Sequence, residues 1–383
     1  MPLFSRPDAR VAQTPLSLRW DIRHHWQDLQ KEFGGNETTA AVILALVTSG
    51  GWVSYSRHKP HYSPPLRYRS RLYTYRRIVG AADRLDALGL IEHDRTPPGH
   101  RGWQSAMLAS SELIARTNRI LATGPRLAIV PPQETIILRD DAGELADYRD
   151  NMSTMRMRHS LQRINDAIRD TDVSDNMAAP MVRIFNRTFR RGGRWYAAGG
   201  GWQSMKKEAR GLIKIGGERV VEIDYKTLHP AMLYAQAGAA LSGDSYAIEG
   251  WPRALVKICL LVLINAKNRQ SSRLAIAKHA AMEPIANLGS QQAFAAADRL
   301  INDVKRVHYP IASAFHADKG AELMVLDSAL AETVMHLMLQ QGVLVLPIHD
   351  SFLVPQSKAE LLEKIMLEVA HGAGFSGLQI AYA

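Results

Sequence analysis

The sequence predicts a mixed α/β protein in which a winged-helix-like module precedes a larger α/β part. Three observations support this fold class. The first hundred residues alternate helix-like and strand-like segments in the order of a winged helix. Short apolar strands near 220–224 and 343–354 each carry an aspartate at an end or a turn. Helical patterns with one apolar face separate these strands.

Composition places the chain among ordinary globular proteins. Its 383 residues favour two or three compact units, and 46% hydrophobic with 22% charged residues suffice for a core. We find no apolar run of membrane-spanning length, and the beginning MPLFSRPDAR lacks a secretory apolar stretch. The single cysteine, Cys259, excludes an internal disulfide framework and a multi-cysteine zinc site. We therefore expect a cytoplasmic monomer with no membrane partner.

The charge balance indicates a polyanionic partner. The chain holds 47 Lys and Arg against 37 Asp and Glu, for a formal net charge of +10. Such a surplus favours nucleic acid first and a membrane surface second. Solubility alone is the other reading of the charge.

The N-terminal elements follow the winged-helix order. Helices are predicted over 17–33, from Asn36 onwards, and over 70–88, with a strand at 52–55 between the second and third. Residues 90–109 then predict strand, turn and strand. In this order the third helix is the one that reads DNA.

The segment Arg57–Arg77 contains seven Lys and Arg, no Asp or Glu, and four interleaved tyrosines. Cations with stacking rings suit contact with a nucleic-acid backbone and its bases. The alternative is a solvated face on a winged helix that binds protein. The nucleic-acid-binding candidates in this segment are Arg67, Arg69, Arg71, Arg76 and Arg77.

The middle of the chain is less informative. Residues 124–150 predict a linker with one strand, and residues 145–172 are polar and helical without a complete core face, so we expect a mobile helical arm. The predicted division is a winged-helix-like DNA-binding domain at 1–115, a linker with a thumb-like arm at 116–182, and a catalytic part at 183–383.

Two aspartates stand at positions suited to metal binding. The apolar strand at 220–223 ends at Asp224, before a predicted helix from Leu228 to Ala240. Residues 343–354 predict a strand hairpin that displays His349 and Asp350 at its tip. A carboxylate held between buried strands is costly without a cation nearby. The alternatives are a helix cap for the first aspartate, and for the second an Asx turn or an HD phosphohydrolase dyad.

A helix beginning at Pro252 places Arg253, Lys257, Leu261 and Asn265 on one stripe. Two cations one turn apart can grip a triphosphate. The alternative is a pair of snorkelling cations on a buried helix. Another helix is predicted from Ala321 to Gln341. Its expected core stripe is Leu326, Leu330, Val334 and Leu337.

Residues 183–210 combine eight Lys and Arg with a single acid, and they include paired and triple glycines. Glycine allows close backbone approach, and the neighbouring aromatic rings offer stacking faces. Arg191, Arg194 and Tyr196 are therefore candidates for nucleic-acid binding. A glycine-rich surface loop is the alternative.

The order of these segments resembles the superfamily of family A DNA polymerases and single-subunit phage-type RNA polymerases. IDYKTLHP, RALVKICLLVLINA and PIHDSF are similar to its first palm motif, its finger helix and its His-Asp hairpin. FRRGGRWY resembles its Gly-Arg loop, and DYKTLHP is also similar to the family B palm motif. The resemblance covers about 183–356. Its two aspartates lie 350 − 224 = 126 residues apart, which implies small fingers.

The resemblance implies a right-hand polymerase palm with small helical fingers, a reduced thumb and two Mg²⁺ ions, with Mn²⁺ as an alternative. Asp224 and Asp350 would be catalytic metal ligands, and the Ile223 carbonyl a further ligand. Lys257 would give a proton to the leaving group, and His349 would contact the primer end. The implied nucleotide-binding set is Arg253, Lys257, His229, Asn265 and Tyr225.

Three function classes follow from these residues. The first is a DNA-directed DNA polymerase that uses template, primer and nucleoside triphosphates. The second is an RNA polymerase or primase on the same palm, and the third a non-enzymatic DNA-binding regulator with a vestigial palm. His229, five residues after Asp224, stands where the family senses the sugar, and its bulk predicts a preference for dNTPs.

Overall fold

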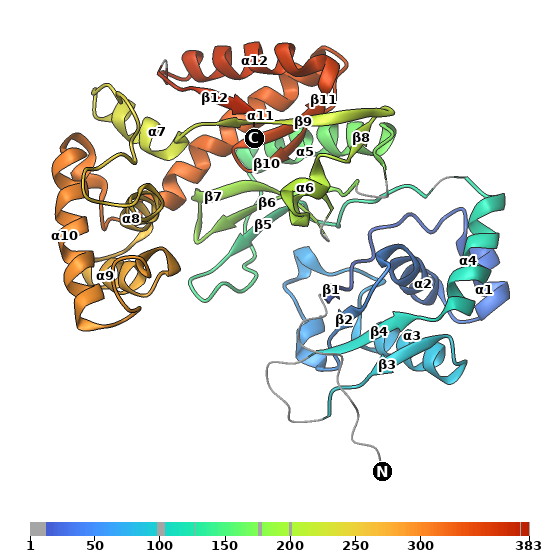
Figure 1. Cartoon of the computed structure of the whole chain (residues 1–383). Coiled ribbons are helices and arrows are strands. Elements are labelled where there is room, and N and C mark those ends of the chain that lie inside the picture. The colour runs from blue at the N-terminus through green and yellow to red at the C-terminus, as the bar shows by residue number, and fades with distance from the viewer. Residues whose placement is uncertain are drawn as a thin grey trace. The chain divides into compact units, whose positions relative to one another are not determined.

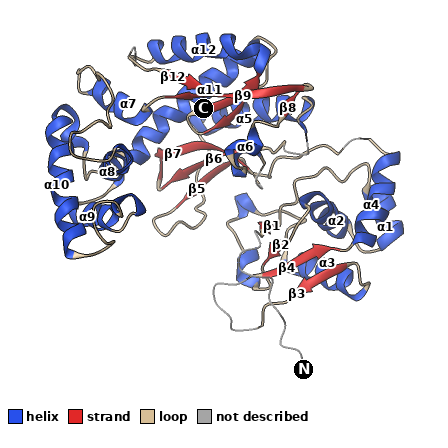
Figure 2. Cartoon of the chain, in the orientation of Figure 1, coloured by secondary structure: helices blue, strands red, loops and turns tan. Residues whose placement is uncertain are grey.

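The protein is mixed α/β and divides into two compact units. The computed structural model describes residues 13–97, 104–125, 127–174, 178–198, 201–375 and 377–382. Unit 1 comprises Met1–Arg183 and Tyr196–Val220, and unit 2 comprises Ile184–Trp195 and Val221–Ala383. Helices and short strands occur in both units (Figures 1 and 2). Among the helices in the described ranges, none combines the length and apolar composition that a bilayer crossing needs.

Unit 1 contains the segments for which the sequence predicted a winged-helix-like module. Its helices are α1 (Trp26–Phe33), α2 (Glu37–Ser49), α3 (Tyr75–Ala87), α4 (Ser111–Thr123), α5 (Met152–Asp170) and α6 (Lys207–Arg210). Its first sheet has the order β1-β2-β4-β3 and is formed by β1 (Thr14–Pro15), β2 (Val53–Tyr55), β3 (Ile91–Asp94) and β4 (Ser105–Ala109).

The expected order of helix, helix, strand, helix and two wing strands is confirmed over 26–109. Strands β3 and β4 pair antiparallel, and most of the turn predicted between them, at 96–102, lies outside the described residues. Asn36 caps α2, since its side chain accepts from the backbone N–H of Thr38 and Thr39. Helix α2 buries Val42, Ile43 and Leu44 completely, so it is the centre of this core.

Two predicted helix starts are wrong. Residues 17–25 are not helical, because the backbone of Trp20 forms an antiparallel bridge with Ile129 and uses the same groups that a helix needs. Helix α3 begins at Tyr75, not at Ser70. The Leu72 carbonyl accepts from the Thr38 hydroxyl at 2.9 Å, so that carbonyl is engaged outside any helix.

The helical arm also differs from expectation. Helix α5 buries Leu161, Ile164 and Ile168, a stripe at helical spacing, so it has a core face of its own. The amide of Asn165 accepts from the Met181 N–H at 2.6 Å and donates to its carbonyl at 3.0 Å. These contacts fix α5 to strand β6 (Met181–Asn186). The structure therefore contradicts a freely moving arm.

Unit 2 holds most of the second half of the chain. Its helices are α7 (Leu228–Gln236), α8 (Arg253–Asn265), α9 (Arg269–Ala277), α10 (Gln291–Val307), α11 (Gly320–Gln340) and α12 (Ala359–Gly372). The sheet order is β10-β11-β9-β12, from β9 (Glu218–Tyr225), β10 (Leu346–Ile348), β11 (Ser351–Pro355) and β12 (Ile380–Tyr382), with β8 (Lys214–Ile215) paired to β9.

Helices cover this sheet and build a second helical group beside it. Helix α12 packs against α11 and β11, and helices α8, α9 and α10 pack on one another (Figure 1). A further sheet has the order β5-β6-β7, with β5 (Ile136–Arg139) and β7 (Thr188–Ala197). The division into units falls within β6, β7 and β9, so β8 and the start of β9 belong to unit 1. The strand expected in the linker is β5.

The predicted hairpin is confirmed, whereas α7 is shorter than expected. Strands β10 and β11 pair antiparallel, and the pair Ile348 and Ser351 encloses His349 and Asp350. Helix α7 ends at Gln236 because Gly238 takes a left-handed φ of 65°, and the Ala239 N–H donates back to the Tyr234 carbonyl.

Helix α11 confirms the predicted helix but not the whole of its core stripe. Leu330 and Val334 are buried, whereas Leu326 and Leu337 line an open groove beside α12. The buried face runs instead through Leu323 and Asp327. A carboxylate therefore occupies a core position of this helix.

Candidate active site

Asp224 and Asp350 lie on neighbouring backbone segments of the unit 2 sheet. The Tyr225 N–H donates to the Asp350 carbonyl at 3.2 Å, which joins the end of β9 to the hairpin tip. On the other side of β9, Asp224 pairs with Ala381 of β12. Both aspartates are half-buried. The sheet thus brings the backbones of two aspartates that are distant in sequence next to each other.

The hairpin tip is held in place from β9. The Ser351 hydroxyl donates to Glu222 at 2.9 Å, and Ser351 is buried. His349 adopts a left-handed backbone with φ of 58°, uncommon for a residue other than glycine. The conformation of Asp350 is therefore set by its two neighbours and by β9. Glu222, which we did not single out from the sequence, acts here as a supporting residue.

The aromatic ring of Tyr246 lies against the two cations of α8. Arg253 lies 5.1 Å and Lys257 5.9 Å from its centroid. Burial raises the pKa of Tyr246, the Arg253 charge opposes this, and the charges of Asp244, Asp350 and Asp224 raise the pKa further. The pKa of this buried tyrosine therefore depends on four charged groups.

The two cations of α8 are exposed, as a ligand-binding stripe requires. Arg253 pairs with Asp244, with Nε 2.6 Å and Nη2 3.2 Å from the carboxylate. This pair is largely solvated, so it contributes little to stability, and Arg253 can exchange it for a stronger anion. Lys257 is exposed one turn further along the helix.

Asp327 of α11 forms an ion pair with Arg194 and also contacts His229. The Asp327 side chain is fully buried, and its Oδ2 accepts from Arg194 Nη2 at 2.6 Å and Nε at 2.9 Å. The same oxygen lies 2.8 Å from Nε2 of His229, so Nε2 donates to it; in the corresponding tautomer of a neutral imidazole, Nδ1 carries the lone pair. Among the described residues, no group hydrogen-bonds Oδ1 of Asp327. Arg194 and His229 are therefore fixed by one carboxylate.

His349 shares the electrostatic environment of this ion pair. Burial lowers the pKa of His349, the Arg194 charge lowers it further, and the charges of Asp350 and Asp327 act in the opposite direction. His349 is therefore neutral at pH 7. Its pKa depends both on the Arg194–Asp327 ion pair and on Asp350.

Several residues predicted for the site make contacts within the fold. The Tyr225 hydroxyl donates to the Met366 carbonyl of α12 at 2.7 Å and is buried, so Tyr225 is a core residue. The side chain of Asn265 donates to the Leu261 carbonyl at 2.8 Å. Its oxygen also approaches Gly320 of α11, where a Cβ would lie only 1.8 Å away. Ile223 is fully buried in β9.

The Gly-Arg segment is engaged within the fold. Arg191 donates to the Asp318 carboxylate at 2.6 Å. Gly192 and Gly193 have φ of 84° and 82°, and a Cβ on Gly193 would lie 2.5 Å from the Phe185 ring. These glycines therefore allow β7 to approach β6, which is a different reason from the contact with nucleic acid that we predicted. Tyr196 belongs to unit 1 and is half-buried.

The basic segment of unit 1 divides into paired and available cations. Arg67 forms ion pairs with Glu134, Asp147 and Asp150, so its guanidinium connects the basic segment to residues 134–150. Arg71 pairs with Glu37, and Arg69 donates to the Pro64 carbonyl. Within the described ranges, no ion-pair or hydrogen-bond partner is found for Arg76 and Arg77 of α3. Arg76 is exposed and Arg77 half-exposed.

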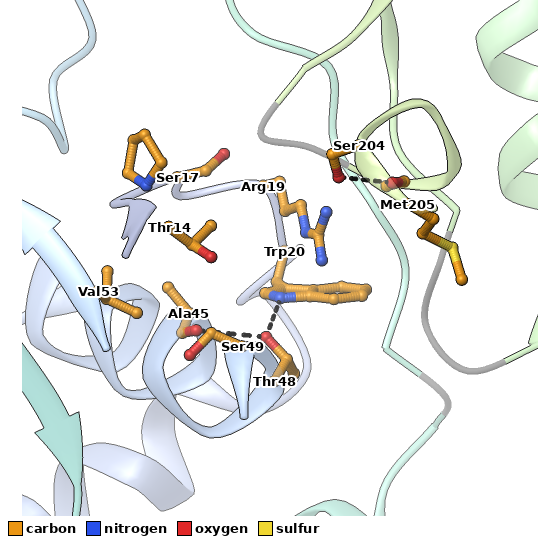
Figure 3. A pocket seen from close by; sticks show the side chains of 12 residues that line it. Thr14, Ser17, Arg19, Trp20, Ala45, Thr48, Ser49, Val53, Ser204 and Met205 are labelled. Carbon is orange, nitrogen blue, oxygen red and sulfur yellow. Dashed lines mark hydrogen bonds between the residues drawn. The ribbon is translucent and has the colours of Figure 1, made fainter. Parts of the chain in front are cut away.

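Unit 1 also has a pocket of about 190 Å³ (Figure 3). The Trp20 indole donates to the Thr48 hydroxyl at 2.7 Å, and Arg19 stacks 5.0 Å from the Trp20 ring. Burial lowers the pKa of Arg19. Figure 3 shows that hydroxyls of Thr14 and Ser204 also border the space. The pocket contains none of the residues predicted for catalysis.

The donor set around Asp224 and Asp350 suits a hard divalent cation. Their charges act together on Tyr246, and carboxylate oxygens are the ligands that Mg²⁺ prefers. In the described part of the chain, no group of three or more His, Cys, Asp or Glu forms a ready-made metal site. Two protein carboxylates leave room for ligands from a substrate, as Mg²⁺ sites commonly do.

A scan against protein-family models gives no match for this chain, and a search of curated proteins finds no similar sequence. The functional argument therefore rests on the residues and the geometry described above.

The most informative residues that the sequence reasoning missed are Tyr246 and Asp327. Asp327 had a signal, because it stands at helical spacing with Leu323, Leu330 and Val334 and so replaces an apolar residue in a core stripe. Tyr246 lies in a loop between two helices, where no periodicity marks it.

We expect unit 2 to lose stability on mild acidification, in part because His308 becomes protonated. Its Nε2–H donates to the Ser245 carbonyl at 2.9 Å, and its Nδ1 accepts from Tyr234 at 3.0 Å. Burial lowers the pKa of His308 below its unfolded value, so the stability it contributes is present above about pH 6.5 and lost as pH falls below it.

The measurement is the free energy of unfolding between pH 7.5 and 5. His308→Gln keeps a donor and an acceptor without the titration, and should reduce the slope by up to about 1.4 kcal/mol per pH unit. The exposed His371→Gln is the control and should leave the slope as in wild type. An unchanged slope in His308→Gln would refute the assignment.

Proposed function

We propose that this protein is a template-dependent nucleotidyltransferase, a small DNA-directed DNA polymerase that uses Mg²⁺ at Asp224 and Asp350. The observation that carries the proposal is the grouping around Tyr246. The two exposed cations of α8 lie 5.1 Å and 5.9 Å from the centroid of this ring, and the charges of Asp224 on β9 and Asp350 at the hairpin tip raise the pKa of its hydroxyl. Carboxylates for metal next to cations for a triphosphate are the parts that phosphoryl transfer needs.

In this proposal each group has a defined task. Asp224 and Asp350 hold Mg²⁺, which when bound supplies charge for the attacking and leaving oxygens. Arg253 exchanges its exposed contact with Asp244 for the triphosphate. Lys257, exposed and one turn away, donates a proton to the departing pyrophosphate. Neutral His349 shapes the hairpin tip beside Asp350.

A second candidate is an RNA polymerase or primase on the same residues, and one observation favours it. Asp327 takes the Nε2–H of His229, so Nδ1 is the acceptor that remains. If the sugar lies beside His229, as the family resemblance implies, a ribose 2′-hydroxyl can donate to Nδ1. The bulk of the same ring favours dNTPs, so the two candidates differ in which effect dominates.

The α8 cations give a test of the site. We expect Arg253→Ala and Lys257→Ala each to raise the nucleotide KM about tenfold, while the Kd for primed template stays within about twofold, since a charge-assisted phosphate contact contributes about 1.5–3 kcal/mol. Arg269→Ala, in the neighbouring helix α9, is the control and should change neither value. A fall in template affinity alone would make the stripe a backbone-binding surface.

For duplex DNA we expect binding through α3. Replacing Arg76 and Arg77 by alanine should weaken binding and reduce the slope of log K against log salt by about 2, because each phosphate contact contributes about 0.9. Arg116→Ala is the matched control, since Arg116 pairs with Glu32 and Glu112. An unchanged slope in the double variant would remove α3 from the DNA-binding surface.

A further inference from the structure

The loop between α7 and α8 holds Tyr246 in a fixed position. The Tyr246 N–H donates to Asp244 Oδ1 at 3.0 Å, and the preceding carbonyl, of Ser245, accepts from His308 at 2.9 Å. His308 is in turn fixed by the Tyr234 hydroxyl, and both rings are buried. The backbone around Tyr246 is therefore tied both to its own loop and to the helical core of unit 2.

The Tyr246 ring presents a fixed surface to two flexible side chains. Only 6% of Tyr246 is exposed, whereas Arg253 and Lys257 are both exposed. Free Lys and Arg side chains sample many rotamers, and ordering each costs about 1.5–2 kcal/mol. A cation within about 6 Å of a ring centroid is attracted to the ring face. Both cations meet this distance, at 5.1 Å and 5.9 Å.

The contact between Tyr246 and the two cations is made through the ring. Arg253 and Lys257 lie over it at 5.1 Å and 5.9 Å from the centroid. Among the described residues, none hydrogen-bonds the Tyr246 hydroxyl. Besides burial and the charges of Arg253 and Asp244, the charges of Asp350 and Asp224 raise the pKa of this hydroxyl.

We propose that Tyr246 is a positioning residue that orders Arg253 and Lys257 for the triphosphate of the incoming nucleotide. The inference deepens the proposed function and rests on it. Because the ring holds the cations before the nucleotide arrives, less entropy is lost on binding. The ring face, rather than the hydroxyl, carries this role.

The test compares Tyr246→Leu with Tyr246→Phe in the full-length chain. The leucine variant loses the ring, so we expect its nucleotide KM to rise about five- to tenfold, with kcat and the template Kd within about twofold of wild type. The phenylalanine variant keeps the ring and should keep the wild-type KM. An unchanged KM in the leucine variant, or an equal rise in both variants, would overturn the proposal.

The matched control is Phe294→Leu, which removes a ring that Arg273 covers at 4.6 Å on helices that carry none of the predicted site residues. It should leave the nucleotide KM unchanged. If the leucine variant melts more than about 10 °C below wild type, Tyr246→Met takes its place, since methionine fills irregular space. Wild type that incorporates no nucleotide would refute the proposed function, whereas active wild type with an insensitive Tyr246→Leu variant would refute this inference alone.

Discussion

Asp224→Asn and Asp350→Asn should each reduce nucleotide incorporation by about a thousandfold or more while the protein remains folded. Each substitution removes one negative charge from a pair that acts jointly on Tyr246, and a metal site loses several kcal/mol of transition-state stabilisation when a carboxylate ligand is lost. Asparagine keeps the shape of the side chain. The measurement is extension of a primed template with Mg²⁺, together with thermal unfolding.

The control for these variants is Asp298→Asn. Asp298 is a carboxylate of the same unit that pairs with Arg273 at 2.7 Å on α9, and its loss should leave incorporation within about twofold of wild type. Activity above about a tenth of wild type in either Asp224→Asn or Asp350→Asn would remove that aspartate from the catalytic site.

Asp327→Leu should destabilise unit 2 by up to about 3–5 kcal/mol, because it leaves the partly buried Arg194 guanidinium without its carboxylate. It also removes the acceptor that orients His229. Urea denaturation gives the free energy of unfolding. Removing both partners should cost less than removing one, so the double variant Arg194→Met, Asp327→Leu should recover part of the loss.

The comparison between these variants decides whether the pair is coupled. Equal destabilisation by the single and the double variant would show that Arg194 makes no net contribution through Asp327. A single variant within about 1 kcal/mol of wild type would contradict the assignment of Asp327 as a buried, charge-bearing anchor.

Local patterns predicted much of the fold. Apolar runs of strand length ended at Asp224 and turned around Asp350, and the structure has β9 and the β10–β11 hairpin there. Helix α8 begins at Arg253, directly after the proline that predicted its start. These predictions succeeded because a buried strand and a helix start each produce a recognisable sequence pattern within a few residues.

Long-range contacts explain what the sequence could not show. The bridge between Trp20 and Ile129 prevents a helix at 17–25, and the packing of Gly193 on Phe185 accounts for the paired glycines. In the candidate site, the roles of Tyr246 and Arg194 depend on partners that are distant in the chain or lie in a loop without periodicity. Such pairings have no local signature.

The central claim is that the residues around Tyr246 transfer nucleotides as a template directs. The most direct measurement is single-nucleotide incorporation on four primed DNA templates that differ only in the first templating base, with each dNTP and each NTP supplied alone with Mg²⁺. The account predicts that wild type adds the complementary nucleotide on each template, in the dNTP series if it is a DNA polymerase and in the NTP series if the second candidate holds. Addition that ignores the templating base, or no addition from either series by folded protein, would contradict it.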